Sequence, residues 1–568
     1  MSWEDMPEKI KQRYNWKDGY LYIGKKELAN YYIRVVAYLN SPSGKEYVKI
    51  QYVVDEMEEV YEDLIEFDED IFMSKTPPNI CKNKCIVLSK AKKRDVWILL
   101  QRQLVNRNKD GWILDRLGWN QIRNRWVYCT GNEMIVPSDF SENLFVFPEL
   151  EEKFQISCAD NMSEKEVLNQ ICGSHLLKSP VPCVCLLYHV TSLLRELLFH
   201  AGVEQQFVLY IYGKTSTFKT TTAKYFFDIY RKKTGKSVAC ADLSSSEVAL
   251  ETMVSEFKDC VFILDDLSPS NTKAEMNKKT NRVNNLIRTV SNCEIRYVQS
   301  GNNVTGKEIQ CALALTAEYP PMVESIMNRT IILNTEEFPL SEETLNLYRN
   351  RPFLINNFTH SFLKWVVENA EKIQEWANEY WQDICDGFVP NSYLRRMAVS
   401  LKVLWVSARI LIKFLRENDI ETEQIPSAIS EVLCKVCISE KSQLEALNKN
   451  RGSEAKISEV IVKLVQNGDI AYFLPQITNH GARCDYYFDK ERKYILISTD
   501  YLVQKVNELI ENGIYSKISI GKKLKFEGVL YLEEGRNIVK REGRSYYKIN
   551  IKALQDVTGI DIYGILIK

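Results

Sequence analysis

The sequence predicts an α/β fold with a parallel sheet at the centre of a larger chain. Residues 206–212, 261–264 and 309–315 form three short, almost wholly apolar runs, the pattern of strands buried on both faces of a parallel sheet. Polar residues follow each run, and ligands in such sheets bind at the carboxyl ends of the strands. With 568 residues, the chain has room for roughly three to five domains.

Composition and charge exclude some classes of protein. The hydrophobic share of 45% and the charged share of 26% are those of a folded globular chain. The formal net charge of −1 excludes a uniformly basic coat, so contacts with nucleic acid must come from local patches. The first ten residues have no apolar segment after a basic flank, and no apolar run reaches the ~18 residues that a membrane span needs. We therefore expect a cytoplasmic protein with no membrane partner.

Residues 1–150 are expected to form a β-rich domain. Two β-branched and aromatic runs within residues 31–54 flank a Ser-Pro-Ser-Gly turn, which predicts a hairpin. A second short hairpin is expected after Leu117-Gly118-Trp119. Residues 180–202 have a proline start, helical spacing of apolar residues and a terminal glycine, so they predict a buried helix just before the first core strand.

The segment after the first core strand is similar to a phosphate-binding loop. Such a loop needs glycine, four spacers and then Gly-Lys-Ser/Thr; Gly213, Lys219 and Thr220 match, whereas Phe218 stands in place of the second glycine. A helix is expected to continue to Gly235, so that backbone N–H groups at its start could face a phosphate. We interpret the loop as a variant but active site. The residues expected to contact ATP are Gly213, Lys214, Thr215, Ser216, Thr217, Phe218, Lys219, Thr220 and Thr221.

The other two core strands supply acidic and polar groups at the same edge. Asp265 and Asp266 follow the second strand, where Asp265, together with Thr220, could hold Mg²⁺ and Asp266 could polarise the attacking water. The alternative is a strand followed by a capped helix, with Asp266 and Ser268 as simple caps. Thr316 and Glu318 end the third strand and could sense the γ-phosphate. The combination favours a site for ATP and Mg²⁺.

The order of these motifs resembles the core catalogued as domain of unknown function 927 (DUF927), from hexameric, AAA+-related replicative helicases of phages and integrated mobile elements. The resemblance spans roughly residues 15–335 and rests on "LGW", "GKTSTFKTT", "SSSEVALE", "FILDDL", "VSNCEIR", "LALTAE" and "SIMNRTIIL". It implies a P-loop ATPase core of the AAA+/RecA-like type over residues 151–335 and a hexameric, DNA-binding assembly. It also implies catalytic roles for Lys219, Asp265, Asp266, Thr316 and Arg329, the last supplied to a neighbouring subunit.

The sequence departs from the family pattern at three places. Phe218 replaces a glycine, Asp266 stands where many relatives have glutamate, and Ala317-Glu318 stands where Gly-Glu is usual. These departures bear on the rate of turnover more than on nucleotide binding.

A hairpin is expected within residues 294–309, between the second and third core strands, because two strand-like runs flank a turn-forming cluster. In the helicases that this chain resembles, a loop so placed enters the central channel and grips single-stranded DNA. Arg296 and Lys307 would then contact phosphates and Asn303 would be a donor at the tip. The alternative is an ordinary surface hairpin with solvated charges.

Residues 336–425 show helical spacing and predict a helical lid or bundle. Beyond it we expect a winged-helix-like connector over residues 426–498 and a C-terminal winged helix over residues 499–568, with helices at 500–512 and 517–526 and a β-ribbon after them. The ribbon is rich in basic residues, and Lys540, Arg541 and Arg544 are candidates for contacts with duplex DNA. A solvated face or a protein docking surface would have the same composition.

The sequence and the resemblance together predict an ATP-dependent, ring-forming DNA helicase or translocase of a mobile genetic element, active in DNA replication. A regulatory or defence NTPase that binds DNA without unwinding it is the main alternative. A catalytically inactive scaffold is a third, and it would explain Phe218 most simply.

Overall fold

The structure of the chain is a computed structural model that separates into two compact units, residues 1–441 and 442–568. Each unit is described by itself. The residues that the structure describes are 3–54, 59–74, 90–158, 162–173, 175–243, 245–269, 272–292, 296–300, 303–307, 309–383, 395–452, 456–470, 485–489, 491, 493–509, 515–533, 535–541 and 543–567.

The first part of the chain is rich in strands, as expected. The hairpin predicted within residues 31–54 is confirmed as β4 (Tyr32–Asn40) and β5 (Glu46–Val54). The pair belongs to a five-stranded sheet in the order β11-β7-β4-β5-β6, and α3 (Lys90–Leu104) packs against β4. The other three strands are β6 (Glu59–Glu66), β7 (Gly111–Leu114) and β11 (Leu144–Val146), and a smaller sheet is formed by β1 (Tyr14–Lys17), β2 (Tyr20–Ile23) and β3 (Lys26–Ala29).

The second predicted hairpin is also present. Its strands are β8 (Gly118–Ile122) and β9 (Arg125–Cys129), to which β10 (Met134–Ile135) is added. Trp119 of β8 is fully buried and makes edge contacts with the rings of Trp126 and Tyr128. These aromatic side chains fix β8 and β9 against the core that follows.

A five-stranded parallel sheet forms the core of the first unit, with the strand order β15-β16-β19-β13-β20. The first core strand, β13, therefore lies between the last two strands in the sequence, and its five residues are all buried, because both faces of the sheet are covered. The strands are β13 (Val208–Tyr212), β15 (Cys240–Asp242), β16 (Lys258–Leu267), β19 (Gln310–Ala317) and β20 (Thr330–Asn334).

Two predicted helices differ from expectation, since one is divided and the other ends early. The helix predicted over 180–202 is divided at Leu194 into α6 (Pro180–Leu193) and α7 (Arg195–His200). The helix after the phosphate loop, α8 (Lys219–Phe227), stops eight positions before Gly235. It stops because β14 (Tyr230–Arg231) pairs with β12 (Gln155–Ile156) and buries Tyr230 completely.

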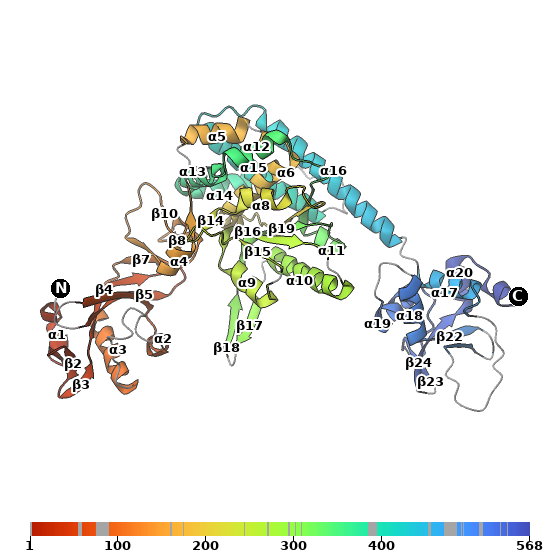
Figure 1. The fold of residues 1–568 in the computed structure, drawn as a ribbon, viewed down its shortest axis with the longest axis horizontal. Coiled ribbons are helices and arrows are strands. Elements are labelled where there is room, and N and C mark those ends of the chain that lie inside the picture. The colour runs from red at the N-terminus through yellow and green to blue at the C-terminus, as the bar shows by residue number, and fades with distance from the viewer. Residues whose placement is uncertain are drawn as a thin grey trace. The chain divides into compact units, whose positions relative to one another are not determined.

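The hairpin expected between the second and third core strands is confirmed in its backbone. It consists of β17 (Arg296–Ser300) and β18 (Asn303–Lys307), which pair antiparallel over five residues, and it follows α10 (Lys273–Asn292). Figure 1 shows it projecting away from the five-stranded sheet. Its side chains lie outside the described residues.

Helices dominate after β20, as predicted. Glu440, on α16, is fully buried, and its Oε1 accepts a hydrogen bond of 2.6 Å from the backbone N–H of Ile332 in the edge strand β20. Burial raises the pKa of Glu440 to about 8. The helices after β20 are α12 (Glu342–Asn350), α13 (Leu354–Glu368), α14 (Ala370–Asp383), α15 (Arg395–Glu417) and α16 (Ile425–Gly452), and the short α11 (Glu324–Met327) lies just before it.

The second unit is a small α/β domain, with the two helices and the ribbon that the sequence predicts. Its four-stranded sheet has the order β21-β22-β24-β23. Ile461, Ile497, Leu524 and Tyr547 share one core, which joins residues from both sides of position 498. The elements are α17 (Ile457–Gln466), β21 (Tyr486–Phe488), β22 (Tyr494–Ser498), α18 (Thr499–Leu509), α19 (Lys517–Phe526), β23 (Val539–Arg541), β24 (Arg544–Asn550), α20 (Ile551–Thr558) and α21 (Ile562–Ile567).

Within the described part of the chain, no helix combines the length and the apolar character that crossing a membrane requires.

Candidate nucleotide-binding site

The predicted phosphate loop lies at the carboxyl end of β13, directly before α8. Gly213 has to be glycine for lack of space, because a Cβ there would overlap the hydroxyl group of Thr335. Thr217 Oγ1 donates a hydrogen bond of 2.8 Å to the carbonyl of Lys214, which closes the loop on itself. Strand, loop and helix thus follow in the order that a phosphate loop needs.

The structure explains the departure at Phe218. Its backbone is left-handed, with φ of 61° and ψ of 22°, a conformation that glycine adopts without strain. Phe218 therefore has a backbone that suits the expected glycine, at a cost of roughly 1–2 kcal/mol for a residue with a Cβ. Its side chain is 42% exposed and lines the cavity next to the loop.

Lys219 is folded back onto its own loop. Its Nζ donates hydrogen bonds of 2.7 Å to the carbonyl oxygen of Gly213 and 2.6 Å to that of Lys214. Burial lowers the pKa of Lys219, and the nearby carboxylates of Glu318 and Asp266 oppose this shift. The ammonium group is therefore held at the loop by groups that a phosphate oxygen could replace.

Three predicted residues from three elements meet beside the loop. Thr220 Oγ1, at the start of α8, donates a hydrogen bond of 2.7 Å to Asp265 Oδ1. Thr316 Oγ1, in β19, donates one of 2.5 Å to the same oxygen. The backbone N–H of Asp266 in turn donates to Thr316 Oγ1 over 3.0 Å. The structure thus brings together the groups that the sequence places at one edge of the sheet.

A local irregularity in β16 presents the two aspartates. The register between β16 and β19 shifts between Leu264 and Leu267, and Asp266 has a left-handed backbone with φ of 66°. Asp266 lines the cavity, whereas Asp265 contacts the two threonine hydroxyls. The cavity has a volume of about 250 Å³ and is lined by Thr215, Ser216, Phe218, Lys219, Thr220, Thr221, Asp266, Thr316, Ala317 and Glu318.

These residues fit a nucleotide with its metal ion. A hydroxyl and a carboxylate are the hard oxygen ligands that Mg²⁺ prefers, and Thr220 and Asp265 present them within hydrogen-bonding distance of each other. The start of α8 adds backbone N–H groups that favour an anion. The donor set therefore has the chemistry that a nucleotide–magnesium complex requires.

Arg329 lies away from this cavity. It precedes β20, and its carbonyl accepts the N–H of Val208 at the start of β13, whereas the loop follows the end of β13. The five residues of β13 separate the two edges by roughly 16 Å at about 3.3 Å per residue. The guanidinium donates a 2.8 Å hydrogen bond to the carbonyl of Ser325.

The predicted DNA-binding residues lie on two β-ribbons. The side chains of Arg296, Asn303, Lys307 and Arg541 are outside the described residues. Lys540 is exposed on β23, and Arg544 Nη1 lies 3.5 Å from Asp485 Oδ1.

Sequence reasoning missed two residues at the loop, Thr335 and Glu336, which follow β20. Thr335 Oγ1 donates a hydrogen bond of 2.7 Å to Thr217 Oγ1. Glu336 Oε1 accepts the backbone N–H of Lys214 over 2.9 Å, and Oε2 lies 2.9 Å from Lys214 Nζ. The signal was available, because polar residues that follow the apolar run of β20 must reach the same edge of the sheet as Asp265.

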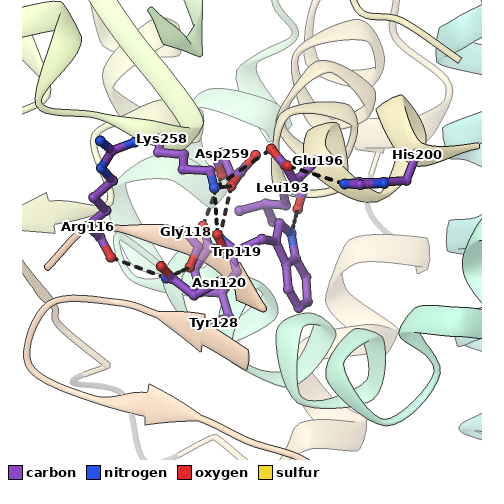
Figure 2. Close-up of polar contacts among 10 residues, drawn as sticks. All are labelled: Arg116, Gly118, Trp119, Asn120, Tyr128, Leu193, Glu196, His200, Lys258 and Asp259. Carbon is purple, nitrogen blue, oxygen red and sulfur yellow. Dashed lines mark hydrogen bonds and ion pairs between the residues drawn. The ribbon is translucent and has the colours of Figure 1, made fainter. Parts of the chain in front are cut away.

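At the opposite end of β16, Lys258 and Asp259 form a buried junction with β8 and β9 (Figure 2). Asp259 Oδ2 accepts the backbone N–H of Trp119 over 2.9 Å, and Lys258 Nζ donates to the carbonyl of Trp119 over 2.6 Å. The backbone carbonyl of Asp259 accepts the hydroxyl of Tyr128. A Cβ at Gly118 would overlap the Asp259 carboxylate. The Leu-Gly-Trp motif is thus a joint between the β8–β9 hairpin and a core strand.

Asp259 is a buried carboxyl group with a raised pKa. It is 1% exposed, and burial raises its pKa to about 7, whereas the nearby Lys258 ammonium acts to lower it. Glu196 also approaches Lys258, at 3.7 Å. Among the described residues, Asp259 Oδ1 has no hydrogen-bond partner.

Comparisons with known proteins extend this description. No curated protein matches the chain. A solved structure described as "SCCmec type IV Cch - active helicase" is similar over 96% of this chain and 99% of that one, with a TM-score of 0.53 and 15% sequence identity. At this identity the similarity shows the fold alone. Residues 29–280 match the family described as "Domain of unknown function (DUF927)", a range that includes the phosphate loop and both aspartates. The family expected from the motifs is thereby confirmed over residues 29–280, the part of the chain that matches the family model.

Proposed function

We propose that the chain is an ATPase that moves on single-stranded DNA as a ring of identical subunits, a helicase or translocase that serves the replication of a mobile genetic element. The observation that carries the proposal is the convergence of Thr220, Asp265 and Thr316 beside a phosphate loop that ends in Lys219. A fold shared with a structure described as a helicase supports it.

In the proposed reaction, Lys219 leaves the two loop carbonyls and neutralises charge on the β- and γ-phosphates. Thr220 and Asp265 would hold Mg²⁺, which when bound supplies positive charge to the phosphate oxygens. Asp266 faces the cavity and would orient the attacking water. Thr316, bonded to both aspartates, would couple their positions to the γ-phosphate.

Arg329 would act in a neighbouring subunit. It lies at the amino edge of the sheet, too far from the cavity of its own chain to contact a nucleotide there. A planar, permanently charged guanidinium supplied by a neighbour would make hydrolysis depend on assembly. This arrangement agrees with a closed ring, which the family resemblance suggests to be a hexamer.

DNA contacts would come from the two β-ribbons. In the β17–β18 hairpin, Arg296 pairs directly with Lys307 at the base, and Asn303 pairs with Ser300 next to the turn. In the second unit, Arg541 pairs with Arg544 at the tip of the β23–β24 ribbon, beside Lys540. The first ribbon would grip single-stranded DNA, and the second would contact duplex phosphates in the manner of a winged helix.

The test is ATP turnover with and without single-stranded DNA, with the mass of the assembly measured in parallel. We expect ATP turnover that DNA stimulates. Turnover should be lost in Lys219→Ala, because the substitution removes the positive charge that faces the transferred phosphoryl group and leaves the sheet undisturbed. Lys307→Ala should keep the basal turnover and lose much of the stimulation.

Each contrary outcome selects an alternative. ATP turnover without strand displacement would favour a regulatory or defence NTPase. Failure to bind ATP would favour an inactive scaffold. Equal turnover in Lys219→Ala would overturn the assignment of the phosphate loop.

A further inference from the structure

We propose that Glu336 is a nucleotide-gating residue: its carboxylate holds the first spacer of the phosphate loop, opposes the incoming triphosphate, and so sets the affinity for nucleotide. The inference rests on the proposed ATPase function and deepens it.

The contact is made by one side chain to two groups of one residue. Glu336 Oε1 accepts the backbone N–H of Lys214 over 2.9 Å, and Oε2 lies 2.9 Å from Lys214 Nζ. The backbone N–H of Glu336 donates to Asn334 Oδ1 over 3.0 Å, which fixes the short turn after β20. A carboxylate therefore already bonds a main-chain N–H of a loop whose N–H groups serve anions.

A second set of contacts holds the same half of the loop. Thr215 Oγ1 donates a hydrogen bond of 2.7 Å to Glu318 Oε1, and Thr335 bonds to Thr217 over 2.7 Å. Lys214, Thr215 and Thr217 are thus attached to residues that follow β19 and β20. In this conformation Lys219 points its ammonium group at the loop carbonyls.

Glu336 is charged when it makes this contact. The hydrogen bond with the Lys214 side chain is the main influence on the Glu336 carboxyl, and it lowers its pKa. Lys219 and the carboxylates of Glu336 and Glu318 also interact electrostatically. A triphosphate that approaches Lys219 meets this negative charge and has to overcome it.

The strength of the contact suits a gate. The side chains of Lys214 and Glu336 are 82% and 39% exposed, and ion pairs this open to solvent are weak and screened by salt. A ligand that carries several negative charges can therefore displace the carboxylate. If Glu336 only held the loop in shape, removing its charge would loosen the loop and weaken nucleotide binding, the opposite of what a gate predicts.

The experiment measures the affinity of the full chain for ADP and for a slowly hydrolysed ATP analogue, both with Mg²⁺, together with the KM and kcat of turnover. Glu336→Gln removes the charge and keeps an oxygen that can accept the Lys214 N–H. Glu337→Gln is the matched control, since it is the adjacent residue with the same change of charge, and its carboxylate accepts the hydroxyl of Ser439 instead of reaching the loop.

We expect Glu336→Gln to bind nucleotide about two- to fivefold more tightly than the wild type, with a lower KM and an unchanged kcat. The difference should shrink as salt is added, and Glu337→Gln should match the wild type. Equal or weaker binding by Glu336→Gln would overturn the gate. So would an equal gain in Glu337→Gln, which would point to net charge alone.

The outcome also separates this inference from the proposed function. If the wild type binds nucleotide and Lys219→Ala does not, the ATPase site stands and only the gate is under test. If neither the wild type nor Glu336→Gln binds nucleotide, both the gate and the proposed ATPase fail.

Discussion

The two ends of β16 each have an aspartate, but the two aspartates lie in different surroundings. Each has an aspartate with a left-handed backbone, Asp259 with φ of 52° and Asp266 with φ of 66°, and at each the register with β19 is irregular. Asp259 is buried under the β8–β9 hairpin, whereas Asp266 lines a cavity. Residue type and backbone are alike, so the surroundings decide which end holds the fold and which is free to react.

The partners of each end explain the difference. The Asp259 carboxylate accepts the N–H of Trp119, and its backbone carbonyl accepts the hydroxyl of Tyr128, two buried groups that need a hydrogen-bond partner. Asp265, one residue before Asp266, bonds threonine hydroxyls that can turn toward another oxygen or a cation. Substitutions at the two ends should therefore separate stability from activity.

The largest effect is expected for Asp265→Asn. The amide keeps an acceptor for Thr220 and Thr316 but loses the negative charge, so turnover of ATP should fall roughly a thousandfold, as for the loss of an electrostatic group at a reacting centre. Steady-state kinetics and a denaturant titration on the same preparation check this. A parallel loss of stability would show that this end of β16 is structural as well.

Asp259→Leu should have the largest effect on stability. It leaves the N–H of Trp119 without its acceptor and puts a bulky side chain in a left-handed backbone, which together cost about 3 kcal/mol of unfolding free energy. Denaturant unfolding followed by tryptophan fluorescence measures the change. An unchanged free energy of unfolding would show that the contact between Asp259 and the β8–β9 hairpin does not stabilise the fold.

The pH dependence of stability should differ between the wild type and Asp259→Asn. The folded-state pKa of about 7 lies above the ordinary aspartate value of about 3.8, so the folded chain binds this proton more tightly. The stabilisation is complete below about pH 4 and is lost as the pH rises through about 7, by roughly 1.4 kcal/mol per pH unit. Asn cannot titrate, and it tolerates the left-handed backbone. Between pH 4 and 8 the wild type should therefore lose unfolding free energy relative to Asp259→Asn as the pH rises, and parallel profiles would contradict the assignment.

The smallest effect is expected for Phe218→Gly. Glycine relieves the left-handed strain but adds freedom to the unfolded chain, so the unfolding free energy should change by less than about 1 kcal/mol. ATP turnover should stay within about threefold. Phe218→Val is the control, because a β-branched residue is strained at this φ and should lower both quantities. Loss of turnover in Phe218→Gly would mean that the ring itself serves the nucleotide.

The sequence predicted the elements whose signals are local. Apolar runs and turn residues predicted the three core strands and the ribbon near Arg296. The positions of Lys219, Asp265 and Thr316 were predicted because parallel strands place their carboxyl ends at one edge of the sheet. The end of α8 at Phe227 was missed, because it depends on pairing with β12 far away in the chain. The bond from Asp259 to Trp119 joins residues 140 positions apart, and no local pattern marks it.

The glutamate that seals β20 has a consequence for how copies of this chain can associate. An uncovered edge strand has unpaired N–H groups that can pair with a strand of another chain, which promotes aggregation. Glu440 fills this place at Ile332 with a side chain from the chain's own helix. The addition of a strand from another copy of the chain is therefore blocked at Ile332.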